Sequence, residues 1–93
     1  MTVRSDAISA EGWEFLRRSL GLSLLQTEIV RRLFQGKSCQ EIAREMGIRP
    51  RMVRTQVDRL HRALGVSNRL QLVLHMLVSL REHWEEGGEY LST

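Results

Sequence analysis

Residues 47–64 read GIRPRMVRTQVDRLHRAL and predict a turn followed by a helix with two unlike faces. Gly47 suits a turn that needs a positive φ angle, and Pro50 suits the first position of a helix, where its missing N–H costs nothing. The helical repeat gathers one apolar stripe, formed by Val53, Val57, Leu60 and Leu64. The opposite arc is mostly charged and holds Arg51, Arg54, Thr55, Asp58, Arg59 and Arg62. We therefore expect one face of this helix to pack on a core and the other to meet an anionic partner.

The residues just upstream predict a second, shorter helix. Ser38 and Glu41 have the spacing of a capping box, in which each side chain satisfies an unpaired backbone N–H. The apolar residues Ile42, Ala43 and Met46 follow the box. Two helices joined through residues 47–49 are typical of a helix-turn-helix, whose second helix lies in the major groove of DNA.

The distribution of charge supports a nucleic-acid face of limited extent. Over 93 residues the formal net charge is only +3, but residues 31–69 hold ten Lys and Arg against three Asp and Glu, a net +7. Residues 1–30 sum to −1 and residues 70–93 to −3. Lys and Arg neutralise phosphates and release their counterions, so a basic middle favours nucleic acid. A merely solvated charged face is the simpler alternative.

The composition argues against catalysis, bound metals and membrane insertion. The single Cys39 cannot form an intramolecular disulfide or, by itself, a zinc site. His61, His75 and His83 show no ligand spacing and no pairing with a nucleophile, so we interpret them as surface or interface residues and predict no catalytic residue, metal, cofactor or small-molecule ligand. The most apolar stretch, residues 70–80, is interrupted by polar residues and is too short to span a bilayer, so we expect a soluble, cytoplasmic protein.

Two further helices are predicted before the helix-turn-helix. Residues 1–8 show no periodic pattern and are expected to be frayed, after which Ser9 can cap a helix that Gly21 stops. Its apolar stripe consists of Trp13, Leu16 and Leu20, which either buttresses the domain or forms a partner surface. Residues 22–36 predict a support helix that begins at a capping box of Ser23 and Gln26 and ends at Gly36. Its inward face consists of Leu22 or Leu25, Ile29, Val30, Leu33 and Phe34.

The last predicted helix, residues 69–84 or so, is apolar over most of its circumference. Gly65 ends the preceding helix, and Asn68 with Gln71 in the box position starts this one. Leu70, Val73, Leu77, Leu80 and Trp84 fill one stripe, Leu74 and Val78 widen it, and Leu72 and Met76 lie well to the other side, while Gln71, His75, Ser79 and Glu82 form a polar arc. The apolar girdle covers about 240°, against the roughly 100° that one small core needs. A 93-residue chain has a small core of its own, so this excess indicates a second subunit.

As a set, these residues resemble the LuxR/GerE family of bacterial transcription regulators over about residues 22–78. The resemblance is carried by Leu22-Ser23, Glu28-Ile29-Val30, Gln35-Gly36-Lys37-Ser38, Glu41-Ile42-Ala43, Met46-Gly47-Ile48, Met52-Val53-Arg54, Val57 and Leu64-Gly65-Val66-Ser67-Asn68-Arg69. It implies an all-α, four-helix helix-turn-helix domain, which we place at residues 22–86. From the sequence pattern outside the resemblance we expect an N-terminal helical extension at 1–21 and a flexible tail at 87–93. The resemblance also implies double-stranded DNA as the partner and a homodimer through the fourth helix of the domain. For a transcription regulator we also count RNA polymerase among the expected partners.

The resemblance carries functional roles onto single positions. The base-reading positions are Arg54, Thr55 and Asp58, and the phosphate-contacting positions are Lys37, Ser38, Arg51 and Met52, with Gln56 between the two groups. To the predicted phosphate contacts we add Arg49, Gln56 and Arg62. On the fourth helix of the domain, which the resemblance implies is the dimer contact, we predict that the contact is formed by Leu70, Leu74, Leu77, Val78 and Arg81. The chain departs from the family pattern at Gln26 (usually Glu), Arg49 (often Ser), Met52 (often Thr) and Asp58 (basic or neutral), which leaves the operator open. For Asp58 we favour pairing with Arg54 or Arg62 along the helix over hydrogen bonding to a cytosine amino group.

Three alternatives stay open at this point. The fourth region of a sigma factor also has a helix-turn-helix, but it lacks the residue 65–69 motif and the long last helix. A helical adaptor could keep the fold and bind protein instead of DNA. The family's domain is commonly attached to a receiver or sensing domain, which residues 1–21 do not encode, so the chain is either a stand-alone regulator or a piece of a longer one.

Overall fold

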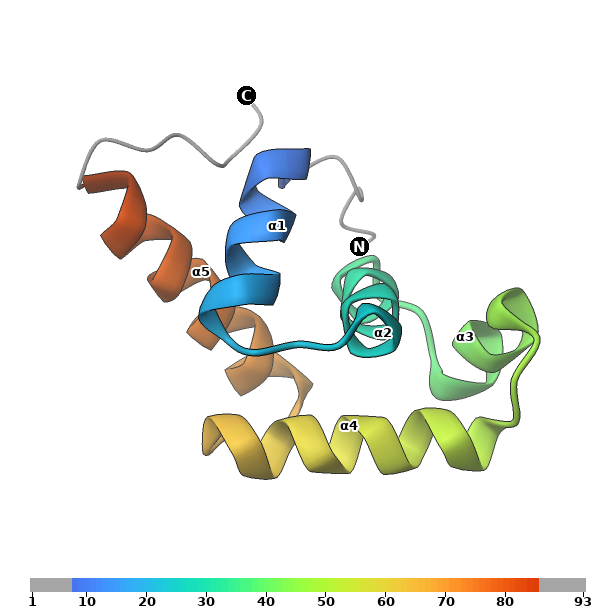
Figure 1. The fold of residues 1–93 in the computed structure, drawn as a ribbon. Coiled ribbons are helices and arrows are strands. Elements are labelled where there is room, and N and C mark those ends of the chain that lie inside the picture. Colours follow the sequence, from blue (N-terminus) through green and yellow to red (C-terminus); the bar gives the residue numbers. More distant parts are fainter. Residues whose placement is uncertain (1–7, 86–93) are drawn as a thin grey trace.

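The computed structural model describes residues 8–85, with side chains through Glu82, and folds this part of the chain into five helices and no strand. They are α1 (Ala10–Ser19), α2 (Leu24–Phe34), α3 (Cys39–Met46), α4 (Pro50–Leu64) and α5 (Arg69–Glu85). In Figure 1, α4 runs along one edge of the molecule, α2 and α3 lie over it, and α5 rises from its far end with α1 beside it. The all-α prediction is confirmed. Residues 1–7 and the predicted tail at 87–93 lie outside the described residues.

Local side-chain signals set the start of each of the first three helices. Ser9 Oγ accepts a hydrogen bond from the Gly12 N–H at 3.1 Å. At Ser23 and Ser38 the capping boxes are complete, because each serine accepts from the backbone N–H three residues on and the side chain there returns a bond to the serine N–H. The three predicted caps are confirmed.

Glycine and proline set the ends of α3 and α4. Gly47 and Gly65 both have a φ angle of 68°, and they end α3 and α4 respectively. A side chain is strained in this left-handed conformation, so both positions favour glycine. Pro50 is the first residue of α4, as predicted, and Arg49 stands at its N-cap without a side-chain capping bond.

The start of α5 differs slightly from the prediction. Asn68 Oδ1 accepts from the Gln71 N–H at 2.9 Å, as a cap should. Gln71 Oε1 accepts in return from the Ser67 N–H at 2.7 Å, one residue earlier than a standard capping box. Arg69 also donates to the Lys37 carbonyl at 2.7 Å, which ties this start to the loop before α3.

One buried cluster runs through all five helices. From α1 it takes Trp13 and Leu16, so this helix buttresses the domain, the first of the two alternatives. The Trp13 ring packs edge-on against Phe34 of α2, with ring centroids 5.8 Å apart, and the Arg31 guanidinium lies over its face at 5.7 Å. Such aromatic and cation–π contacts stabilise a packed pair beyond the area they bury.

The expectation that residues 1–8 are frayed is wrong at Ile8, which is only 2 % exposed. Ile8 precedes the Ser9 cap and Trp13 is the fourth residue of α1, which is the spacing of a hydrophobic staple. A residue outside the helix lies outside the helical repeat, so periodicity did not reveal it. The staple spacing would have done so.

Helix α5 presents one apolar side to the core and leaves another uncovered. Leu72, Met76 and Leu80 are buried, whereas Leu70, Leu74 and Val78 are 67 %, 50 % and 45 % exposed. The core therefore takes the side with Leu72 and Met76, not the centre of the wide stripe, and His75 and Ser79 of the polar arc lie half-buried beside it. The predicted surplus of apolar surface is thus present on this chain.

No single helix in residues 8–85 is long and apolar enough to cross a membrane. Only α4 and α5 taken together reach the necessary length and composition, and they are bent by 53° at the break between them.

Candidate nucleic-acid interface

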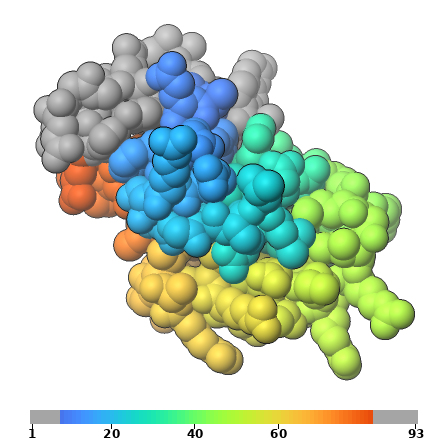
Figure 2. Space-filling model, in the orientation of Figure 1, coloured from blue at the N-terminus to red at the C-terminus, as the bar shows by residue number. Residues whose placement is uncertain are grey.

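The two faces predicted for the helix at residues 50–64 are both present in α4. Val53 and Leu60 are buried, with Val57 and Leu64 partly covered beside them. The predicted base-reading residues Arg54, Thr55 and Asp58 are all exposed, as are the phosphate candidates Arg49, Arg51, Met52 and Arg62. Figure 2 shows α4, in yellow and yellow-green, along the lower edge of the molecule with long side chains projecting away from the body.

The turn between α3 and α4 fixes how α4 leaves the domain. After the left-handed Gly47, the Ile48 N–H donates to the Ala43 carbonyl at 3.0 Å, which closes the end of α3. The first turn of α4 then begins with the Arg49 carbonyl accepting from the Met52 N–H at 2.9 Å. Since Arg49 makes no capping bond with its side chain, the first amides of α4 receive no side-chain cap from it.

The arginines of α4 have no acidic partner, unlike the basic residues of α1 and α2 and unlike Lys37; Arg44, Arg49, Arg69 and Arg81 also form no ion pair among the described residues. Within residues 8–82, Arg17 and Arg18 pair with Glu14, Arg31 and Arg32 pair with Glu28, and Arg32 and Lys37 pair with Glu45. The described ion pairs include none from α4. Its positive charge is therefore uncompensated by the rest of the described chain, which favours an anionic partner.

The same observation bears on Asp58. Among the described residues Asp58 forms no ion pair, so the pairing with Arg54 or Arg62 that we favoured from the sequence is not found in the unbound chain. Exposed ion pairs one turn apart stabilise a helix by only a few tenths of a kcal/mol, so the helix loses little when the pair does not form. The carboxylate is therefore open to another partner.

A shallow groove of about 610 Å³ runs along one flank of α4. It is lined by Ile48, Arg49, Arg51, Met52, Thr55, Gln56 and Arg59. Met52 adds an apolar surface between the arginines, and it is 45 % exposed. Gln56 is half-buried, and its Oε1 accepts from Gln26 Nε2 of α2 at 3.1 Å. The flank thus combines positive charge with two apolar and two neutral polar side chains.

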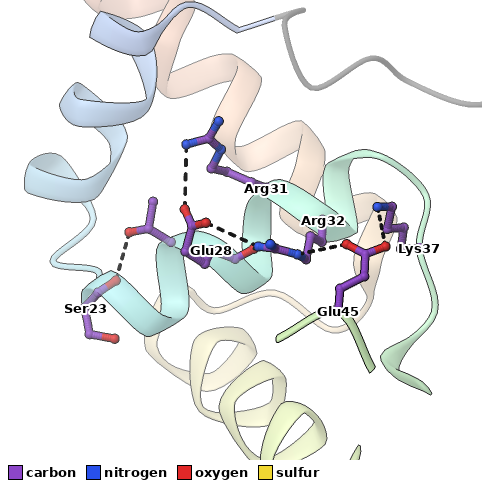
Figure 3. Close-up of polar contacts among 7 residues, drawn as sticks. Ser23, Glu28, Arg31, Arg32, Lys37 and Glu45 are labelled. Atoms are coloured by element: carbon purple, nitrogen blue, oxygen red, sulfur yellow. Dashed lines mark hydrogen bonds and ion pairs between the residues drawn. The ribbon is translucent and has the colours of Figure 1, made fainter. Parts of the chain in front are cut away.

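The predicted phosphate site at the start of α3 is partly occupied by the protein itself. Lys37 Nζ forms an ion pair with Glu45, which also accepts from Arg32 Nε at 3.1 Å (Figure 3). The hydrogen bond from Lys37 lowers the pKa of Glu45, which keeps this carboxylate charged. Lys37 must therefore leave or share Glu45 before it can bind a phosphate.

Ser38 is exposed but is also committed to its cap. Its Oγ accepts from the Glu41 N–H at 3.1 Å, and its own N–H donates to Glu41 Oε1 at 3.0 Å. This backbone hydrogen bond is the main reason why the pKa of Glu41 is lowered. Both the hydroxyl and the amide of Ser38, a predicted phosphate contact, therefore already have partners within the capping box.

Two residues that sequence reasoning did not assign to the site take part in it. Glu45 neutralises Lys37 from eight residues away, and Gln26 contacts Gln56 across thirty residues. The sequence marked Gln26 as the capping-box partner of Ser23 and as a departure from the family's glutamate, but neither signal pointed to the site. Glu45 had no signal, because its partner Arg32 belongs to another helix.

The dimer positions predicted on α5 form a second exposed surface. Leu70, Leu74, Val78 and Arg81 are exposed and Leu77 is half-buried. The part of the chain that the structure describes contains no cluster of His, Cys, Asp or Glu that could hold a metal ion.

Comparison with known proteins gives one match. The family model described as bacterial regulatory proteins, luxR family (GerE), matches residues 21–76, which include α2, α3, α4 and the first half of α5. Neither the curated proteins nor the solved structures yield a significant match. The matched segment contains the helix-turn-helix and the exposed arc of α4, and α1 lies before it.

Proposed function

The chain belongs to the luxR family of bacterial regulatory proteins, whose domain is a DNA-binding helix-turn-helix, and we propose that it recognises specific double-stranded DNA as a dimer with α4 in the major groove. The observation that carries this proposal is the exposed arc of α4, where Arg51, Arg54, Arg59 and Arg62 have no acidic partner among the described residues. A polyanion that fits beside a helix supplies the missing negative charge.

Arg54, Thr55 and Asp58 are proposed to read bases. Arg54 is suited to a guanine, whose O6 and N7 accept the two parallel donors of a guanidinium. Asp58 is suited to a cytosine, whose amino group donates, and its lack of an ion pair in the unbound chain supports this role over the local pairing. Thr55 lies between them on the exposed arc and can contact a base edge by its hydroxyl or its methyl group.

The residues around this group are proposed to hold the DNA backbone. Arg49 and Arg51 lie at the start of α4, and Arg62 lies near its end. The two phosphate backbones that border the DNA major groove would then each meet a positive charge. Met52, Gln56 and Ser38 complete the contact with the backbone. Lys37 takes part only after exchanging Glu45 for a phosphate, which lowers its net contribution.

The uncovered side of α5 is proposed as the dimer contact, formed by Leu70, Leu74, Leu77, Val78 and Arg81. Support comes from the exposure of three large apolar side chains on one side of a helix, since burying apolar surface favours association by roughly 25 cal/mol per Å². A second copy seated there would bring a second α4 to the same duplex. Two copies would then read two half-sites about one helical turn apart.

A salt titration tests the proposal against the adaptor alternative. Binding of the protein to a fluorescent duplex is measured by anisotropy between about 50 and 200 mM salt. We expect log K to fall linearly with log salt with a slope of about −0.9 for each phosphate contact. An adaptor that retained only the fold would show no such slope, and binding that did not depend on salt would contradict the proposal.

A further inference from the structure

The cap of α2 reaches the DNA-facing helix through one side chain, that of Gln26. Its Oε1 accepts from the Ser23 N–H at 3.1 Å, and this bond is one half of the capping box. Its Nε2 donates to Gln56 Oε1 at 3.1 Å, across thirty residues of sequence. Both glutamine side chains are half-buried, so water competes less with these bonds than it would on an open surface.

The donor and acceptor properties of these groups fix the orientation of Gln56. A backbone N–H can only donate, so Gln26 must turn its oxygen toward Ser23. Its remaining amide nitrogen can also only donate, so Gln56 must turn its oxygen toward Gln26. The NH₂ group of Gln56 is then the end that this pair leaves for another partner. Gln56 lines the groove on the flank of α4.

We propose that Gln26 is a positioning residue for DNA recognition, which holds the Gln56 amide so that it offers its NH₂ group to a phosphate oxygen. The proposal rests on the proposed function and adds a residue of α2 to it. A phosphate fits better than a base, because Gln56 lies between the buried stripe and the exposed arc of α4. With α4 in the DNA major groove, a side chain at this position faces the sugar-phosphate backbone and not the base edges. An NH₂ group attracts a phosphate oxygen, whereas an amide oxygen in its place would repel it.

Glutamate at position 26 would reverse this arrangement without removing the cap. One carboxylate oxygen would still accept from Ser23, and a negative charge suits the first turn of a helix. The other oxygen can only accept, so Gln56 would have to turn its NH₂ group inward and its oxygen toward DNA. Changing one atom from nitrogen to oxygen therefore changes the group that the DNA meets, while the fold keeps its capping bonds.

The test is a double-mutant cycle of Gln26→Glu and Gln56→Ala, measured by anisotropy on two synthetic duplexes of unrelated sequence. We expect each single variant to bind both duplexes about tenfold more weakly, the loss of one hydrogen bond to a charged group. When Gln56 is already Ala, Gln26→Glu has no amide to reorient, so it should weaken binding only by the repulsion between the new carboxylate and the DNA. The melting temperature of Gln26→Glu should be no lower than that of the unaltered protein.

Leu24→Glu is the matched charge control. Leu24 is also in the first turn of α2, is 75 % exposed, and lines the groove beside α1 and not the one beside α4. If Gln26→Glu weakened binding no more than Leu24→Glu, or if its full effect persisted in Gln56→Ala, the positioning role would be overturned. Failure of the proposed function would look different, because the unaltered protein would then bind neither duplex in a salt-dependent way.

A measurement on the free protein tests the orientation without DNA. In ¹⁵N-labelled protein, the side-chain NH₂ protons of Gln26 should exchange with water more slowly than those of Gln56, because only the former donate within the pair. The opposite order would overturn the proposal whatever the DNA measurements give.

Discussion

Helices α4 and α5 each bury one side in the same core and leave the other uncovered, but the two uncovered sides have opposite chemistry. That of α4 carries arginines without acidic partners, and that of α5 carries Leu70, Leu74 and Val78. Water solvates exposed charges well but solvates exposed leucines poorly, so the two sides call for different partners. The difference indicates that α4 meets DNA and α5 meets a second copy of the chain.

The sharpest way to break this comparison is to place a charge on the apolar side. Leu74→Glu should raise the dimer dissociation constant about a hundredfold or more, because an unpaired charge buried in an interface costs on the order of 3–5 kcal/mol. Operator affinity should fall with it, since two half-sites would no longer be bound together. Sedimentation of the protein with and without a duplex measures both effects.

Leu24→Glu serves as the control, because Leu24 is even more exposed but lies on α2. It should change neither the dimer nor the helicity. If the unaltered protein sedimented as a monomer at tens of micromolar and stayed monomeric on DNA, the role of α5 would be wrong.

A change on the basic side should affect sequence preference rather than assembly. Arg54→Ala should cost roughly 1–3 kcal/mol on the preferred site and relax the preference at one base pair, because a bidentate contact to one base is lost. Arg18→Ala removes the same charge from α1, where Arg18 pairs with Glu14, and should leave the preference intact. Equal losses for Arg54→Ala on preferred and scrambled duplexes would rule out its reading role.

Asp58→Asn should give a smaller effect of two kinds. Removing a negative charge beside the DNA should raise affinity for random duplexes slightly. Replacing the charged acceptor for a cytosine amino group by a weaker, neutral amide oxygen should cost about 1 kcal/mol at one position. Binding to a panel of single-position site variants measures both. If affinity were unchanged on every duplex, Asp58 would lie outside the groove and the orientation of α4 would need to be turned.

The smallest expected effect compares two phosphate contacts. Arg51→Ala should weaken binding to all duplexes alike and reduce the salt slope by about one. Lys37→Ala should reduce it by less, because Lys37 gives up its ion pair with Glu45 to reach DNA. The salt titration of both variants on one duplex checks this order. A larger effect for Lys37→Ala would show that Glu45 does not hold the lysine in solution.

The parts of the fold with local causes could be predicted from the sequence. The capping boxes at Ser23 and Ser38 and the start at Pro50 depend on residues within three or four positions, and all were confirmed. The core side of α5 could not be predicted, because a helix that is apolar almost all round has no periodicity to select one side. Packing against α1 and the rest of the core makes that selection.

For the site, too, the sequence predicted the local features but not the contacts between distant segments. The exposure of Arg54, Thr55 and Asp58 followed from the helical repeat of α4. The contacts of Lys37 with Glu45 and of Gln26 with Gln56 could not be predicted, because the first joins a loop to α3 and the second joins α2 to α4, and the placement of these segments is a property of the whole fold. These long-range contacts change how much two of the predicted phosphate residues contribute.

The most direct test of the central claim, that α4 reads DNA while α5 joins two copies, is selection of bound duplexes from a random pool, followed by footprinting of the preferred sequence. We expect one enriched site made of two related half-sites whose centres are about 10 base pairs apart, with protection in two successive major grooves on one face of the duplex. A pool that showed no enrichment, or a single half-site protected by one copy, would contradict it.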